Sequence, residues 1–440
     1  MAEKAACLAR LTRTFQNQFL KSRVVTAAMR ILFLSYWGLN DGLTTSTVFP
    51  HLRLLQERAD VSSVRLVTIE RGPEAQAKLA FSPGFPAGKI TFEPLRSRPS
   101  GNVILNKIED FTRFPKELIR QVGEFKPDFI LARGAPAGAL AYLVWQKTKL
   151  PFYVESFEPH ADYMLESGVW RAYDPRYLFQ RHWEKRQKQL ALGLMPVAEN
   201  YRQQLISEGV PAGRIVTVPC SVDADAFAYE AAVGQRVRQR LGFAADATVG
   251  IYVGKFGDIY YDQEAFELFR SAADHFGPAF RLIILTPNAE ADVRRKLAAV
   301  GLGPDRAFVT KAPHAEVPDY LSAADFAFSP IRPAPCRLFC SAIKIGEYWA
   351  NGLPVLVTPG VGDDSAIIAA ENGGAVFDLS QPGSVSAALA RLAALMQQPN
   401  YRTRIHALAV RYRSLNRTRE AYDALLPVGE GGAEQRCRVI

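Results

Sequence analysis

Short apolar runs alternate with longer amphipathic segments along the first half of the chain. The runs at residues 30–36, 129–132 and 151–155 are typical of strands that are buried on both faces of a parallel sheet. The segments between them, such as residues 104–122, have the apolar spacing of helices that cover one face of a sheet. This alternation predicts a doubly wound, Rossmann-like α/β domain over residues 29–205.

The same alternation restarts in the second half. Residues 214–218 are predicted to form its first strand. Further apolar runs continue the series at residues 248–254, 281–285, 307–310, 326–329 and 354–358. We therefore predict a second doubly wound domain over residues 206–395. Ligands of open α/β sheets bind at the carboxyl ends of the strands, so two such domains that face each other would enclose one cleft.

The ends of the chain extend beyond these two domains. Residues 1–28 are either an added helix or a segment that precedes a true start at Met29. Residues 396–426 are predicted to be helical and to pack across both domains, and residues 427–440 to be a flexible tail. No apolar run reaches the roughly 18 residues that span a bilayer, and the first residues lack the apolar block of a secretory signal. We therefore expect a cytoplasmic protein.

The composition adds a preference for anionic partners. Lys and Arg number 53 against 44 Asp and Glu, which gives a formal net charge of +9. This surplus suits an anionic small ligand or an anionic membrane surface. The sequence contains no zinc-finger spacing, aromatic RNA-binding motif or basic DNA-reading helix, so no nucleic-acid partner is expected. The five cysteines are scattered, which argues against a disulfide framework and against a cysteine-based metal site.

A stretch near the end of the second half carries the clearest chemistry. A helix predicted over residues 341–351 places Lys344 and Glu347 one turn apart and stops at Gly352. The start of a helix and a mobile lysine suit a diphosphate, whereas a carboxylate one turn deeper can accept hydrogen bonds from two neighbouring hydroxyls, as a ribose presents. A Lys–Glu pair on a solvated helix face is the alternative interpretation.

The wider stretch, "YLSAADFAFSPIR…SAIKIGEYWANGLPVLVTPG", resembles the donor-site signature of family 4 of the retaining GT-B glycosyltransferases. The segments "AENYRQQLISEGVPAGRIVTVPCSVDADAF" and "IYVGKFGDIYYDQEAFELF" resemble the linker and the opening of the donor site in that family. The resemblance implies two Rossmann-like domains facing across a cleft. It also implies transfer of a sugar from a nucleotide diphosphate donor to a hydroxyl of a glycan or lipid-linked acceptor, with retention of configuration and without a metal or a cofactor other than the substrate.

The resemblance also implies which residues act at the donor. The expected donor-binding residues are Gly254, Lys255, Ser341, Lys344, Glu347 and Tyr348. Of these, Lys255 and Glu347 are expected to act in catalysis. Two departures from the family pattern stand out: Phe339 occupies the place of a carboxylate that touches the transferred sugar, and residues 258–262 lack the second phosphate-binding lysine. Lys344 is hypothesised to supply the missing charge.

The first half offers a smaller set of residues for the acceptor side. Gly42 lies in a loop after the first strand and could let this loop approach the diphosphate or the acceptor. A plain strand-to-helix turn is the alternative interpretation. Glu155, Glu158 and His160 follow a strand at its carboxyl end, and the resemblance implies a catalytic place for His160 near the anomeric carbon or the acceptor. Residues 171–190 interleave basic and aromatic side chains, so this segment is either a peripheral membrane contact or a solvated helix face.

Two rival functions share the predicted fold. A nucleotide-sugar 2-epimerase would interconvert sugars without an acceptor. A non-catalytic nucleotide-sugar-binding protein is the other rival, because Phe339 replaces the first carboxylate of the family pattern.

Overall fold

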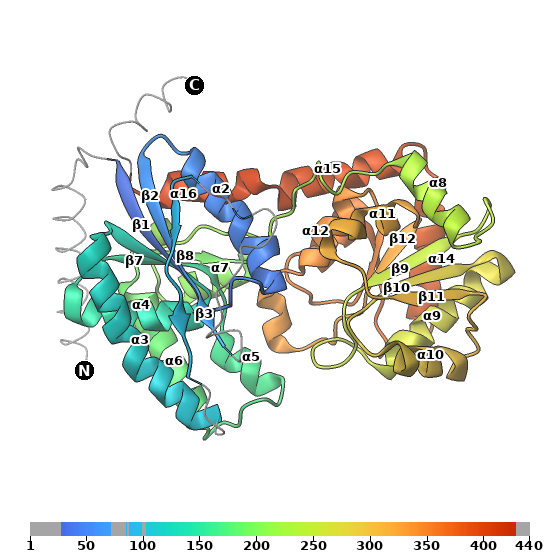
Figure 1. Cartoon of the computed structure of the whole chain (residues 1–440). Coiled ribbons are helices and arrows are strands. Elements are labelled where there is room, and N and C mark those ends of the chain that lie inside the picture. Colours follow the sequence, from blue (N-terminus) through green and yellow to red (C-terminus); the bar gives the residue numbers. More distant parts are fainter. Residues whose placement is uncertain (1–27, 72–84, 86–87, 99–102, 428–440) are drawn as a thin grey trace.

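The computed structural model describes residues 28–71, 85, 88–98 and 103–427, with side chains from residue 109 in the last range. The predictions for the N-terminal extension and the C-terminal tail therefore lie outside the described residues, apart from residues 28 and 427. Within the described part, two six-stranded parallel sheets stand side by side, each covered by helices (Figure 1).

The first sheet is built from residues 29–196. Its strands, in spatial order, are β4 (Ile90–Phe92), β2 (Val61–Val67), β1 (Met29–Ser35), β6 (Phe129–Arg133), β7 (Phe152–Phe157) and β8 (Gly193–Pro196). Its helices are the π-helix η1 (Thr44–Val48), α2 (Phe49–Glu57), α3 (Val103–Phe125), α4 (Ala135–Thr148), α5 (His160–Glu166), α6 (Pro175–Leu190) and α7 (Glu199–Ser207). Two short strands, β3 (Ile69–Glu70) and β5 (Leu95–Arg96), pair beside this sheet.

Strand β1 shows why the first domain has two apolar layers. Alternate side chains of a strand point to opposite faces. Leu32 and Leu34 pack with α3, α4 and α7 on one face, whereas Ile31 and Phe33 pack with α2 on the other. All four side chains are fully buried. The nearly continuous apolar run that predicted this strand is therefore explained by cover on both faces.

The second sheet repeats this plan. Its strands, in spatial order, are β11 (Ala307–Thr310), β10 (Arg281–Leu285), β9 (Val249–Val253), β12 (Phe326–Ser329), β13 (Val355–Val357) and β14 (Gly374–Val376). Its α-helices are α8 (Ala231–Arg240), α9 (Gln263–Phe276), α10 (Glu290–Ala299), α11 (Val317–Ser322), α12 (Ile343–Ala350), α13 (Asp364–Glu371), α14 (Ser384–Met396) and α15 (Tyr401–Arg413). Its 3₁₀ turns are η4 (Gly277–Ala279), η5 (His314–Glu316) and η6 (Pro335–Phe339).

The prediction of a strand at residues 214–218 is wrong. Residues 212–214 form the 3₁₀ turn η3 (Ala212–Arg214), and Ile215 makes only an isolated bridge to Leu194. The amides of Val216 and Val218 donate hydrogen bonds to the carbonyls of Leu194 and Pro196. This segment follows the edge of the first sheet, although the sequence placed it in the second domain. An apolar run that covers a sheet edge has the same pattern as a buried strand.

The last helices connect the two domains. Helix α15 packs against α12 of the second domain, and α16 (Leu415–Leu425) packs against α2 of the first. Figure 1 shows both helices in red, running along the same side of the molecule from one sheet to the other. Ion pairs between Arg58 and Asp423 (2.5 Å) and between Glu57 and Arg419 (2.8 Å) flank the contact of α16 with α2. Across the described ranges, no helix is both long and apolar enough to cross a membrane.

Candidate functional site

Lys344 is a buried cation whose ammonium group forms no hydrogen bond with the part of the chain that the structure describes. It lies in the first turn of α12, is 8% exposed, and its Nζ has no hydrogen-bond partner among the described residues. Two aromatic rings flank the Nζ, that of Tyr260 at 4.0 Å and that of Tyr252 at 4.9 Å from the ring centroid. Burial lowers the pKa of Lys344 to about 7. An unpaired cation held out of water is costly, so this position favours an anionic ligand.

Gly254 brings the backbone close to this cation. It follows strand β9 with a φ of 145°, a conformation that favours glycine. A Cβ atom at this position would lie 2.5 Å from the Nζ of Lys344. Only glycine therefore allows the end of β9 and the lysine to approach each other as closely as they do.

Glu347 lies one helical turn beyond Lys344 and is 6% exposed. Its Oε1 is 2.8 Å from Nε2 of His314, a residue of the turn η5 that sequence analysis did not identify. This hydrogen bond is the main cause of a raised pKa of His314. The imidazole therefore holds the carboxylate at the place where the sequence predicted ribose binding.

Three other predicted donor residues have partners within the protein. Lys255 forms an exposed ion pair with Asp258 (2.6 Å). The Tyr348 hydroxyl is fully buried and accepts a hydrogen bond from the amide of Val253 (2.9 Å). Ser341, which precedes α12, accepts hydrogen bonds from the Cys220 amide (3.0 Å) and from the Arg413 guanidinium.

These three side chains differ from Lys344 because each already has a polar partner within the protein. Tyr348 supports the end of β9, and Ser341 ties the start of α12 to the interdomain linker. Lys255 is the one cation of the three, and its exposed partner Asp258 leaves it able to exchange that partner for a ligand. In the described part of the chain, no group of three or more His, Cys, Asp or Glu residues is placed to hold a metal ion.

The turn η6 of the second domain contacts helices α5 and α7 of the first domain. The Cys336 amide donates to the carboxylate of Glu166 in α5, at 2.9 Å to Oε2. The ring of Phe339 lies 5.0 Å from that of Tyr201 in α7. Phe339, which replaces a carboxylate of the family pattern, thus packs into the apolar cluster of the first domain.

The predicted acceptor residues Glu158 and His160 lie at the start of α5, the helix that η6 contacts. The His160 Nδ1 is 3.6 Å from Glu158 Oε1, and its ring lies edge-to-face with Trp170 at 5.7 Å. Burial is the main cause that raises the pKa of Cys340 to about 12, and the Glu158 charge adds to it.

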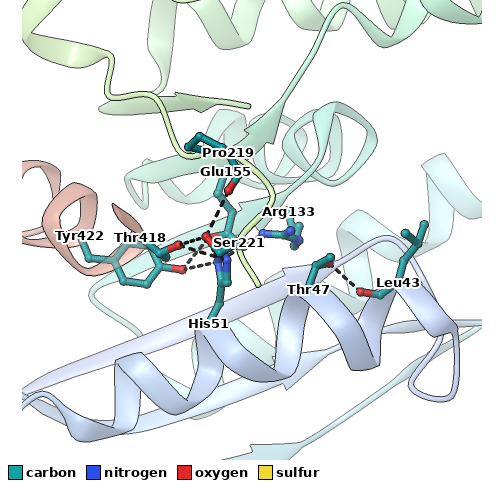
Figure 2. Close-up of polar contacts among 9 residues, drawn as sticks. All are labelled: Leu43, Thr47, His51, Arg133, Glu155, Pro219, Ser221, Thr418 and Tyr422. Carbon is teal, nitrogen blue, oxygen red and sulfur yellow. Dashed lines mark hydrogen bonds and ion pairs between the residues drawn. The ribbon is translucent and has the colours of Figure 1, made fainter. Parts of the chain in front are cut away.

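Glu155 is enclosed in a buried polar network (Figure 2). Its carboxylate accepts hydrogen bonds from Arg133 (2.7 Å) and from the Tyr422 hydroxyl (2.6 Å), and Oε2 lies 3.2 Å from His51 Nδ1. Thr418 and Ser221 continue the network towards the linker. Burial raises the pKa of Glu155, but the charges and hydrogen bonds of these partners outweigh it and hold the pKa at about 2.

Glu155 and Gly42, which were both predicted on the acceptor side, differ in environment. Glu155 is fully buried with its oxygens already occupied, so its geometry favours fixing α16 on the first domain over contacting an acceptor. Gly42 is exposed, two residues before the start of η1, and nothing lies within 4 Å of a Cβ placed there. Its carbonyl accepts hydrogen bonds from the hydroxyls of Thr45 and Ser46.

Comparison with known proteins identifies the family of both domains. Residues 10–221 match the model of the glycosyl transferase 4-like domain, and residues 248–395 match that of the glycosyl transferases group 1. A search of curated protein sequences gave no match. Among solved structures, sucrose-phosphate synthase from Thermosynechococcus elongatus is similar with a TM-score of 0.67 at 16% identity, covering 94% of this chain and 100% of that one.

Two further structures extend the comparison. The HepE protein of Anabaena in complex with UDP has a TM-score of 0.64 at 15% identity, covering 90% of this chain and 99% of that one. The UDP-GlcNAc 2-epimerase of Neisseria meningitidis, bound to UDP-GlcNAc, has a TM-score of 0.58 at 16% identity, covering 90% of this chain and 100% of that one. At these identities the structures show a shared fold, and the two domain matches show the family. The chain belongs to the family 4-like glycosyltransferases of the GT-B fold.

Proposed function

We propose that this protein transfers a sugar from a nucleotide diphosphate donor to a hydroxyl of a glycan or lipid-linked acceptor, with retention of configuration and without a metal or separate cofactor. The observation that carries the proposal is the pair on α12. Lys344 is buried without a partner beside Gly254, and Glu347 lies one turn deeper. A diphosphate and a ribose have the matching chemistry in the matching order.

The same pair explains how the chemical step would be accelerated. Cleavage of the bond between sugar and diphosphate places growing negative charge on the leaving phosphate. A protonated Lys344, buried and already in place, stabilises this charge more strongly in the transition state than in the bound donor. Lys255 adds a second cation after releasing Asp258. Glu347 would hold the ribose and so fix the distance between the diphosphate and the amino end of α12.

The acceptor side of the proposal rests on α5. Contacts between Glu166 and η6 place this helix against the donor half of the molecule. We propose that His160 and Glu158, at the start of α5, orient the attacking hydroxyl. In this proposal the leaving phosphate helps to remove the proton of that hydroxyl. Support comes from the position of α5, whose residue Glu166 accepts a hydrogen bond from the Cys336 amide of the donor half.

Helix α6 supports a lipid-linked acceptor over a free glycan. Tyr173, Leu178 and Phe179 are 72%, 53% and 59% exposed, and the basic residues Arg171 and Arg181 lie among them. Apolar and cationic side chains on one exposed segment suit the headgroup region of an anionic membrane. We therefore propose peripheral contact with the inner face of the membrane through residues 171–190.

A thermal-shift screen with UDP-, GDP- and ADP-sugars would identify the donor. With that donor, we expect Glu347→Ala to lower kcat/KM by about 100-fold or more, because the ribose loses a buried carboxylate. The matched control is Glu316→Ala, which removes an exposed carboxylate of the neighbouring turn and should leave kcat/KM within about twofold. The assay follows transfer to an acceptor and release of the nucleotide.

Three outcomes would count against the proposal. Near-normal transfer by Glu347→Ala would refute the site. Conversion of one donor sugar into another without an acceptor would favour a 2-epimerase. Donor binding without turnover across acceptors of several classes would favour a non-catalytic binding protein.

A further inference from the structure

Arg337 is a second buried cation at the boundary between the domains. It belongs to the turn η6 of the second domain and is 3% exposed. Its guanidinium carbon lies 4.4 Å from the ring centroid of Tyr163, a residue of α5 in the first domain. The Arg337 side chain therefore lies against the same helix that begins with His160.

The guanidinium is incompletely satisfied. Its Nε and Nη1 are buried and have no hydrogen-bond partner within the described part of the chain. Its Nη2 makes one long hydrogen bond, 3.4 Å to the Ser167 hydroxyl. The Glu166 carboxylate, which η6 contacts, accepts its hydrogen bond from the amide of Cys336. The Tyr163 ring offsets only part of the cost of desolvating a guanidinium, so an anion is missing from its surroundings.

Arg337 and Lys344 belong to consecutive elements, the turn η6 and the helix α12. The Nζ of Lys344 lies on the Tyr260 ring, 4.0 Å from its centroid. Burial is the main cause that raises the pKa of the same phenol to about 12, and the Arg337 charge acts on it in the opposite direction. The two cations are separated along the chain only by the end of η6 and the short loop before α12. Both are more than nine-tenths buried and both have unpaired donors.

We propose that Arg337 binds the diphosphate of the donor together with Lys344. This inference rests on the proposed function and adds a phosphate-binding residue to it. A nucleoside diphosphate carries at least two negative charges, which matches two unpaired cations. The fork of a guanidinium binds two phosphate oxygens at once, and such bonds are stronger than those of neutral donors.

Because η6 lies between the domains, a diphosphate bound to Arg337 would also affect the contact between them. Arg337 comes from the second domain but lies on α5 of the first, so a diphosphate bound to it would contact both halves of the molecule. Binding of the donor would then strengthen the contact between η6 and α5. The residues at the start of α5, which we assign to the acceptor, would be placed in the same event.

Isothermal titration of the ligand-free protein tests the inference. The probes are whichever of UDP, GDP and ADP the wild type binds most tightly, and the matching nucleoside. We expect Arg337→Gln to raise the Kd of the diphosphate at least tenfold and to leave the Kd of the nucleoside within twofold. Arg337→Lys, which keeps the charge but not the fork, should lie between the two. The matched control is Arg332→Gln, an exposed arginine of the same loop, which should change neither Kd.

Melting temperatures separate ligand binding from a structural role. Since the Arg337 charge is unpaired without ligand, Arg337→Gln should leave the melting temperature of the ligand-free protein unchanged or higher, while the shift induced by the diphosphate shrinks. An unchanged Kd for the diphosphate, an equal loss for the nucleoside, or a lower melting temperature without ligand would overturn the inference. If the wild type binds none of the three diphosphates, the proposed function fails. If wild type and Arg337→Gln bind one equally well, only the role of Arg337 fails.

Discussion

At the scale of single residues, Lys344 titrates far from its ordinary range in water. Burial brings its pKa to about 7, so the free protein loses this charge just where a diphosphate needs it. Binding of an anion stabilises the charged form and raises the pKa again. Donor binding above about pH 7 should therefore be accompanied by uptake of a proton.

We expect the Kd of the nucleoside diphosphate to rise between about pH 7 and pH 9, approaching tenfold per pH unit, since the free lysine must be protonated before it can pair. Isothermal titration across this range measures the effect. Lys344→Met is the control, and its weaker binding should not depend on pH in this way. A wild-type Kd that stays constant over this range would contradict the assignment.

The same residue has a separate effect on folding. In the ligand-free protein, Lys344 releases its proton at about pH 7, whereas an unfolded lysine keeps it to about 10.5. The unfolded state therefore binds more protons between these values. The contribution of Lys344 makes the free energy of unfolding rise with pH across this window.

Sequence analysis predicted some residues of the candidate site and did not predict others, for a physical reason. Lys344 and Glu347 are one turn apart on one helix, so their relation is visible in the sequence. His314 and Arg337 reach the site from separate turns, and neither has a recognisable spacing to α12. The buried partners of Glu155 were not visible either, because Tyr422 lies 267 positions away along the chain.

At the scale of elements, the alternation of strands and helices predicted both sheets, because every strand that is covered on both faces needs an apolar run. The error at residues 214–218 has the same origin. That segment is also apolar, but it pairs only locally at the edge next to β8. A buried strand and an edge segment differ in whether neighbouring elements cover them. The sequence of the segment itself does not contain this information.

A prediction at the scale of elements concerns membrane association through helix α6. We expect the wild type to float with liposomes that contain anionic phosphatidylglycerol, and the double variant Leu178→Ser, Phe179→Ser to lose most of this association. Val410→Ser removes an exposed apolar residue of α15 and should have no effect. Equal recovery of wild type and double variant, or no flotation of either, would contradict a membrane contact through α6.

At the scale of the whole molecule, the two domains are joined at two neighbouring crossings. The linker around Ser221 is the first, and the junction of α15 and α16 at Ser414 is the second. Val222 and Ser414 form a bridge between them. From there the polar network of Thr418, His51 and Glu155 leads into the first sheet (Figure 2). Any change in the angle between the domains must therefore involve both crossings.

Removing one hydroxyl from this network tests how firmly α16 is held. Tyr422→Phe leaves the buried Glu155 carboxylate with one hydrogen bond fewer, so we expect it to lower the free energy of unfolding by about 1–3 kcal/mol. Urea denaturation measures this change. Glu420→Gln, which breaks an exposed ion pair of the same helix with Arg417, should cost less than about 0.5 kcal/mol. Equal stability of the two variants would show that the buried hydroxyl contributes little.

The position of α16 has a consequence for how the protein is made. Arg133, Glu155 and His51 all belong to the first half of the chain, yet the hydroxyl that completes their hydrogen bonds comes from residue 422. During translation the first sheet therefore emerges from the ribosome long before its last helix exists. Until residue 422 has been made, water must take the place of the Tyr422 hydroxyl beside the Glu155 carboxylate.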